Sequence, residues 1–119
     1  GVLTIMMGAD NHIYYYEGQL KPDGSNFLSA SYNGENSIRE IILKKKADVI
    51  SRSRDAENPE KDFVVVIKPS VDCNYQNVVD ILDEMAINVV KKYALVDISE
   101  GEAQLVSISD KTSQSPTSN

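Results

Sequence analysis

The segment from Asp62 to Ile98 constrains the fold more than any other part of the chain, because it predicts a strand, a loop, a helix and a second strand. Valine and isoleucine dominate Phe63 to Lys68, and Pro69 ends this strand because proline cannot donate to a ladder. A strand that returns through a helix lies parallel to the first one. The segment therefore predicts a β-α-β unit whose second strand is Tyr93 to Ile98.

The helix of this unit begins at Tyr75 and carries one apolar stripe. Apolar residues recur along it at the spacing that buries one helix face, namely Val78, Ile81, Leu82, Met85 and Val89. We expect Leu82 and Met85 to face the sheet. Asn74 or Asp72 can accept from the first free amides of the helix. The opposite face is polar and is expected to lie in water, with Asp80, Asp83, Glu84 and Asn88.

Upstream of this unit the pattern predicts a hairpin and a long loop. Val2 to Met7 and His12 to Glu17 are expected to be strands, joined by a turn at Asp10-Asn11. Asparagine and aspartate tolerate the left-handed backbone that tight hairpins need. The segment 18–34 is rich in glycine, proline, aspartate and asparagine, so it is expected to be a loop, either a surface excursion or a functional segment.

A further helix and a short strand complete the expected elements. Ser37 followed by Glu40 forms a capping-box pattern, which predicts a helix from about Ser37 to about Ser53. Ala103 to Ile108 reads as a short edge strand after a turn. The last residues, 110–119, contain no large apolar side chain and are expected to form a disordered tail.

Together these elements predict one α+β domain over residues 1–109, with the tail at 110–119. The expected order is ββαβαβ with a possible extra strand, in which two helices pack on one face of a mixed sheet. A chain of 119 residues is long enough for one core of modest size.

The composition argues against nucleic-acid binding and against catalysis. The formal net charge of −6 opposes phosphate binding, and the basic run Lys44 to Lys46, with Arg52 and Arg54 after it, is expected to be a solvated helix face. The only histidine, His12, and the only cysteine, Cys73, are far apart in the sequence. No phosphate-binding glycine motif occurs. We therefore expect no catalytic residue, no cofactor and no metal site.

Partner binding is a better-supported function than catalysis, and aromatic and apolar residues on the predicted strands are the candidates for it. Tyr14 and Tyr16 suit a sheet whose second face is not covered by helices; the alternative is that they are ordinary cross-strand partners and that Tyr15 is core. Tyr93 and Leu95 lie in the final strand of the β-α-β unit. If this strand is a sheet edge, its backbone could pair with a strand of a partner.

Several blocks of the chain resemble, in order, the periplasmic domain of the ExbD/TolR biopolymer transport family. The matching blocks are the hairpin Gly8 to Gly18, the valine-rich strand Phe63 to Ile67, the polar loop Asp72 to Tyr75, the helix VVDILDEM at Val78 to Met85 and the strand YALVDI at Tyr93 to Ile98. The glycine turn that often precedes the last strand of the family is missing here, and Asn88 to Lys92 stands in its place.

The resemblance implies a noncatalytic periplasmic coupling module of an inner-membrane motor that uses the proton motive force. It implies a single-pass membrane protein whose transmembrane helix lies outside this sequence. The implied partners are a second copy in a homodimer, an ExbB-like polytopic membrane protein, a TonB-like or TolA-like protein, and peptidoglycan. The alternative is a TolR-like or stand-alone domain that binds peptidoglycan or a small molecule.

Overall fold

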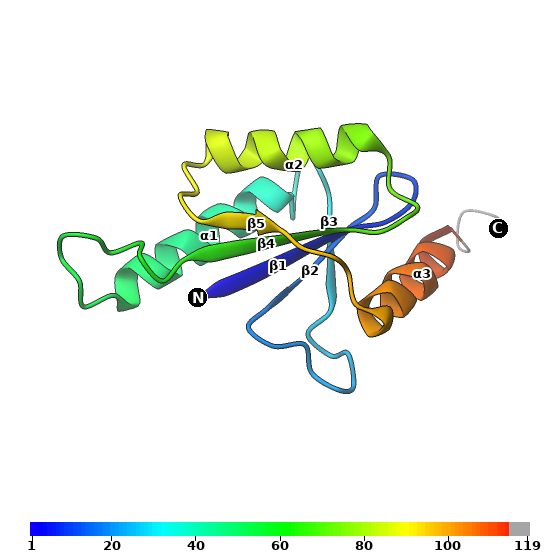
Figure 1. Cartoon of the computed structure of the whole chain (residues 1–119), viewed down its shortest axis with the longest axis horizontal. Coiled ribbons are helices and arrows are strands. Elements are labelled where there is room, and N and C mark those ends of the chain that lie inside the picture. Colours follow the sequence, from blue (N-terminus) through cyan, green and yellow to red (C-terminus); the bar gives the residue numbers. More distant parts are fainter. Residues whose placement is uncertain (115–119) are drawn as a thin grey trace.

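The computed structural model describes residues 1–114 as a five-stranded mixed sheet with three helices (Figure 1). Along the chain the elements are β1 (Val2–Met7), β2 (Ile13–Glu17), β3 (Leu28–Ala30), α1 (Ile38–Arg52), β4 (Val64–Pro69), α2 (Tyr75–Ile87), β5 (Tyr93–Leu95) and α3 (Glu100–Gln114). The strand order is β3-β2-β1-β4-β5. This is the α+β mixed sheet that the sequence predicts.

The β-α-β unit and the hairpin are both confirmed. β4 pairs in parallel with β5, and α2 makes the crossover between them. β1 pairs antiparallel with β2 and in parallel with β4. The hairpin turn has its two central residues in the left-handed region, with φ of 54° at Asp10 and 63° at Asn11.

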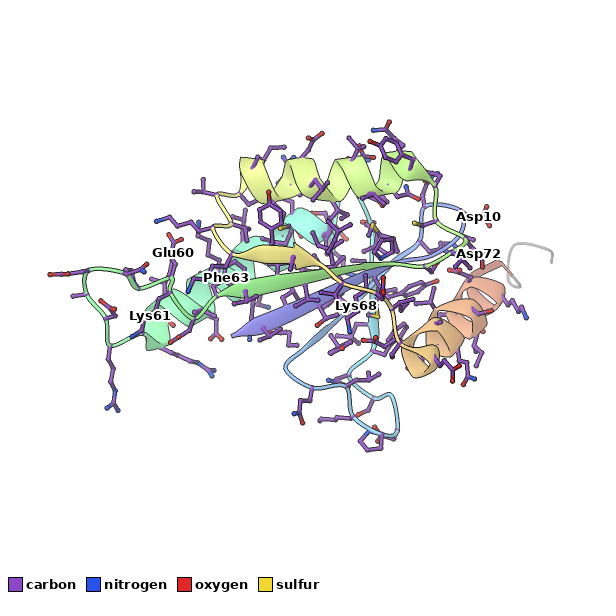
Figure 2. The ribbon with its side chains drawn as sticks, in the orientation of Figure 1. Asp10, Glu60, Lys61, Phe63, Lys68 and Asp72 are labelled. Carbon is purple, nitrogen blue, oxygen red and sulfur yellow. The ribbon has the colours of Figure 1, made fainter. Side chains whose placement is uncertain are left out.

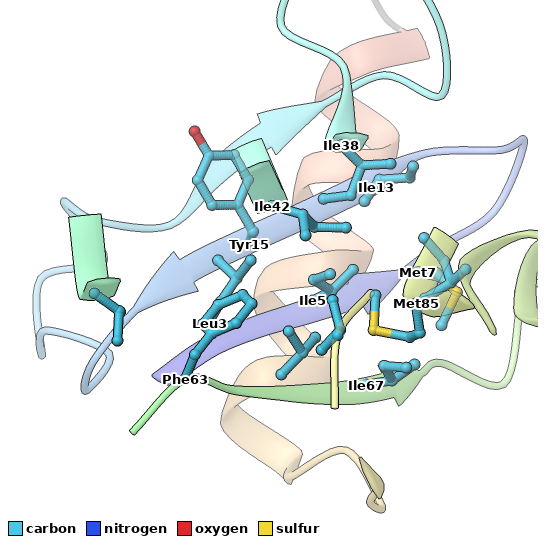
Figure 3. Packing of buried hydrophobic residues seen from close by; sticks show 14 residues of the cluster. Leu3, Ile5, Met7, Ile13, Tyr15, Ile38, Ile42, Phe63, Ile67 and Met85 are labelled. Carbon is cyan, nitrogen blue, oxygen red and sulfur yellow. The ribbon is translucent and has the colours of Figure 1, made fainter. Parts of the chain in front are cut away.

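The main core lies between the sheet and the helices α1 and α2, which cover one face together (Figures 1 and 3). Its fully buried side chains include Leu3, Ile5, Ile38, Ile42, Phe63, Val65, Ile67, Ile81 and Met85. On α2, Ile81 rather than Leu82 is fully buried with Met85, since Leu82 is only half-buried. The helix is thus rotated slightly from the expected phase.

Both predicted helix starts are confirmed by their caps. The Ser37 hydroxyl accepts a hydrogen bond from the Glu40 amide at 3.2 Å. At the start of α2, the Asn74 side chain accepts from the Asn77 amide at 2.8 Å, and the Asn77 side chain accepts from the Asn74 amide at 3.3 Å. This reciprocal pair satisfies amides that have no partner inside the helix.

The strand predicted at Ala103 to Ile108 is wrong, because these residues belong to α3. Ser99 and Glu102 cap this helix reciprocally, with backbone to side-chain distances of 3.0 and 3.2 Å. The helix continues through residues 110–114, so the predicted disordered tail is wrong for these residues, while 115–119 lie outside the described residues. α3 packs on the face of the sheet opposite α1 and α2 (Figure 1).

The polar face of α2 is also less exposed than predicted. Arg39 of α1 donates to both carboxylate oxygens of Glu84 at 2.9 Å, and this hydrogen bonding lowers the pKa of Glu84. Asn88 is buried, and Lys46 donates to the backbone carbonyls of Asn88 and Val89 at 3.0 and 2.9 Å. Part of the supposed solvated face therefore joins α1 to α2.

The basic run on α1 is likewise only partly solvated. Lys44 is exposed, but the side chains of Lys45 and Lys46 are each only 15% exposed. The Nζ atom of Lys45 lies 3.1 Å from a carboxylate oxygen of Glu17. The predicted long loop contains the short strand β3, which pairs with β2. Within residues 1–114, no helix is both long and apolar enough to cross a membrane.

Candidate binding surfaces

The two tyrosines proposed as a partner surface are buried beneath α3. Tyr14 is 2% exposed and Tyr16 is 8% exposed. They form a second small core with Met6 of β1 and Val106 of α3. The expectation that this face of the sheet is uncovered was wrong, because it rested on reading the residues of α3 as a strand.

Glu102 anchors the first turn of α3 to two strands. Its carboxylate accepts from the Tyr16 hydroxyl at 2.6 Å and from Lys68 at 2.9 and 3.0 Å, where Lys68 extends from β4 (Figure 2). Burial by itself would raise the pKa of Glu102, but hydrogen bonds from Tyr16, the Ser99 amide and Lys68 outweigh it and lower this pKa to about 2. The carboxylate is therefore held in its charged form.

Asp110 anchors the last part of α3 to the β1–β2 turn. It accepts from the Ala9 amide at 2.9 Å and from the Tyr14 hydroxyl at 2.6 Å, and the Nδ1 atom of His12 lies 2.8 Å away. Gly8 is required for this approach, since a Cβ atom there would lie 2.5 Å from the Asp110 carboxylate. His12 is partly buried and belongs to this anchor.

The long loop before β3 supports α3 from the side. Leu20 and Phe27 pack against the second core, and the Phe27 ring stacks on Tyr14 with 5.2 Å between ring centroids. An ideal Cβ on Gly24 would be in van der Waals contact with Leu105 of α3. Much of this loop is thus a structural support for the helix.

The other two candidate residues, Tyr93 and Leu95, lie on the edge strand β5 with 47% and 51% of their surface exposed. The amide of Val65 donates to the Lys92 carbonyl, and the amide of Val96 donates to the Ile67 carbonyl. Successive residues of a strand direct their backbone N–H and C=O groups to opposite sides, and Lys92 and Val96 face β4. The backbone groups of Tyr93 and Leu95 therefore point away from β4. They lie on the open edge of the sheet.

A shallow groove of about 350 Å³ adjoins this edge. Its lining is mainly apolar and consists of Pro69, Val71, Leu95, Val96, Asp97 and Ile98. Val71 is 96% exposed, and Val96 is 44% exposed. Together, β5 and this groove offer backbone hydrogen-bonding groups beside apolar surface.

At the opposite side of the sheet lies a larger polar cleft of about 760 Å³, formed by the β1–β2 turn, β2, β3 with its following loop, and the first turns of α2. It is lined by Asn11, His12, Ile13, Tyr14, Ser29, Ala30, Ser31, Tyr32, Asn33, Asn74, Gln76, Asn77 and Asp80. Sequence reasoning missed this cleft, because its residues come from separate segments and match no contiguous motif.

The structure gives His12 and Cys73 different surroundings. His12 contacts Asp110 and the Tyr14 ring, whereas Cys73 packs beside the main core, where burial raises the pKa of its thiol. Among the described residues, no group of three or more histidine, cysteine or carboxylate side chains is placed to hold a metal ion.

Comparison of the chain with protein-family models, with curated proteins and with solved structures gave no match in any of the three.

Proposed function

We propose that this chain is a noncatalytic coupling module of an ExbD/TolR-like, proton-driven inner-membrane motor, located in the periplasm and acting as a homodimer with ExbB-like and TonB-like or TolA-like partners. The observation that carries the proposal is the open edge of β5. The order of the sequence blocks that resemble this family supports it. On this proposal the domain transmits force by holding an extended segment of its TonB-like partner.

The two edge strands, β3 and β5, differ in whether other parts of the chain hydrogen-bond to their outward backbone groups. At β3, the Asn36 side chain donates to the Ser29 carbonyl at 3.0 Å, and the Ile38 amide donates to the Ser31 carbonyl at 2.7 Å. The segment after β3 thus occupies that edge. The outward backbone groups of Tyr93 and Leu95 have no such cover among the residues that the structure describes.

An extended peptide with alternating apolar side chains fits the β5 edge. Its backbone would pair with Tyr93 and Leu95, and an apolar side chain would enter the groove beside Val71 and Val96. The affinity should be modest, because ordering a flexible peptide costs conformational entropy. Modest affinity suits a contact that must release in every cycle of a motor.

The test is to block the edge without disturbing the ladder to β4. Leu95→Pro removes an amide that points outward, so pairing with β4 remains possible. Losing one hydrogen bond of about 1 kcal/mol weakens binding roughly fivefold, and the proline ring adds a steric block. We expect crosslinking of the full-length protein to its TonB-like partner and energy-dependent uptake to fall, in a strain that lacks the chromosomal gene.

Leu28→Ala is the matched control, because Leu28 is a similarly exposed leucine on the opposite edge strand, at 46%. It should leave uptake unchanged, whereas Leu95→Ala should reduce it. Circular dichroism checks that each variant is folded. Normal uptake and normal crosslinking in folded Leu95→Pro protein would refute the assignment of β5 as the partner edge.

The proposed homodimer is tested separately by sedimentation equilibrium on the full-length protein. We expect dimers in detergent. A full-length protein that stays monomeric in detergent and in membranes would contradict the proposal for assembly, while leaving the test of the β5 edge valid.

A further inference from the structure

The polar cleft carries an uncompensated negative charge. Asp80 is its one carboxylate, and among the described residues that line it none is a lysine or an arginine. One oxygen of Asp80 accepts from the Gln76 side-chain amide at 2.8 Å. A neutral amide does not balance the charge, so the second oxygen is available to a cationic donor.

A buried hydroxyl, that of Tyr32, belongs to the lining of the same cleft. The Tyr32 hydroxyl makes no hydrogen bond among the described residues, although such groups in protein interiors are nearly always paired. Burial raises the pKa of Tyr32 most, and the charges of Asp80 and Cys73 raise it further. The Asn77 side-chain amide interacts with the hydroxyl and opposes this rise, but its geometry does not make a hydrogen bond. The hydroxyl thus stays protonated, and Tyr32 lines the same cleft as Asp80.

The wall beside Asp80 is held in place before any ligand arrives. The Asn77 side-chain amide donates to the Asn11 side-chain oxygen at 2.8 Å, which ties α2 to the β1–β2 turn. Asn11 keeps its own amide hydrogens for another acceptor, and Gln76 keeps its side-chain oxygen for another donor. These groups suit a neutral polar part of a ligand, adjacent to the position of its positive charge.

We propose that the polar cleft binds a small molecule in which a primary ammonium group is adjacent to a hydroxyl or an amide group. The ammonium group donates to Asp80 and to the Tyr32 hydroxyl oxygen, and the polar neighbour pairs with Asn11 and Gln76. The same carboxylate disfavours anionic ligands. The site is separate from β5, because its strands, β2 and β3, are at the other side of the sheet.

The test is a titration of the isotopically labelled chain, followed by two-dimensional amide NMR. Ethanolamine is the probe for an amine beside a hydroxyl, and glycinamide is the probe for an amine beside an amide. Ethylene glycol and acetamide are their counterparts without an ammonium group. We expect both ammonium probes to shift the amide signals of Tyr32, Asn77 and Asp80, and the neutral compounds to leave them in place. The tighter of the two probes then identifies the preferred polar neighbour.

Asp80→Asn should weaken the binding of both ammonium probes about tenfold, which corresponds to about 1.4 kcal/mol. Asp83→Asn is the matched control, because it removes the same charge from an exposed position on the same helix and should not change the affinity. Equal binding of the neutral compounds, or unchanged affinity in Asp80→Asn, would overturn the proposal.

Tyr32→Phe tests the proposal if Asp80→Asn fails to fold. It removes only an unpaired hydroxyl, so it should keep the fold while weakening both ammonium probes. Unchanged affinity in this variant would overturn the proposed contact with the hydroxyl. Because these measurements use no membrane partner, their failure does not bear on the β5 edge.

Discussion

Replacing Glu102 by glutamine should loosen the packing of α3 on the sheet. The carboxylate is 4% exposed and accepts hydrogen bonds from Tyr16, Lys68 and the Ser99 amide. Glutamine has nearly the same shape but no charge. It leaves the ammonium group of Lys68, which is only 16% exposed, without its counter-ion.

The magnitude follows from the lowered pKa of Glu102. A fall from the ordinary 4.5 to about 2 means that folding favours the charged carboxylate by about 3 kcal/mol at neutral pH. Glu102→Gln should lower the free energy of unfolding at pH 7 by about this amount. Glu100→Gln removes a charge from an exposed position on the same helix, so it should cost less than about 0.5 kcal/mol.

The dependence on pH gives the prediction a second measurement. Because the pKa of Glu102 is lower in the folded state, its contribution is complete above pH 4.5 and disappears as the pH falls through about 2. The difference between wild type and Glu102→Gln should therefore shrink from about 3 kcal/mol at pH 7 to about 1.5 kcal/mol at pH 3. Near pH 2 it should be below about 0.5 kcal/mol.

Urea denaturation at several pH values measures these differences. Hydrogen exchange of the α3 amides reports the same loss if α3 opens before the rest of the domain. A difference that is the same at pH 7 and pH 3 would show that glutamine acts through packing and not through charge. An equal loss in Glu100→Gln would show that the effect is not specific to the buried carboxylate.

Two further changes test the packing. Ile81→Ala should lower the free energy of unfolding by roughly 2 to 5 kcal/mol, because Ile81 is fully buried in the main core. Asp83→Ala, at an exposed position, should change this free energy little. Similar small losses at both positions, measured by urea denaturation, would mean that α2 is placed with the wrong face inward. Gly8→Ala should displace the Asp110 carboxylate and cost roughly 1 to 3 kcal/mol, with faster hydrogen exchange in α3 but not in α1; unchanged exchange in α3 would contradict the close approach.

The parts of the fold that the sequence predicts are those specified by short-range signals. Ser37 and Asn74 lie three residues before the amides that they cap, so a local pattern reveals both helix starts. The hairpin depends on two adjacent residues, Asp10 and Asn11, which adopt the left-handed backbone that such turns need. The β-α-β unit follows from the lengths and order of three consecutive patterned segments.

α3 was not predicted from the sequence, because most of the buried positions of this helix are acidic. The inward positions repeat every fourth residue, at Glu102, Val106 and Asp110, and two of these three are carboxylates. Such a face has no hydrophobic period, whereas the apolar residues from 103 to 108 roughly alternate as in a strand. The Ser99 to Glu102 capping box is the local signal that could have identified the helix.

The candidate surfaces also differ in how far the sequence predicts them. The sequence left open whether Tyr93 and Leu95 lie at a sheet edge, because it predicted a further strand at Ala103 to Ile108. That segment is part of α3, so β5 is the last strand of the sheet. The burial of Tyr14 and Tyr16 depends on partners 96 and 86 positions away, Asp110 and Glu102, and no local pattern encodes such pairs. The polar cleft likewise combines α2 with segments from the first third of the chain.

α2 connects the two proposed binding sites, yet they should act independently. The helix starts at the polar cleft with Asn74 and Asn77, and the chain after its end leads to β5. Both helix ends are fixed by hydrogen bonds, and the Arg39–Glu84 pair ties the last turn of α2 to α1. We infer that α2 has a single arrangement. Coupling between sites requires an element with two arrangements. Leu95→Pro should therefore leave the affinity of the cleft for ethanolamine unchanged in the NMR titration, and a change of threefold or more would show that α2 moves between two states.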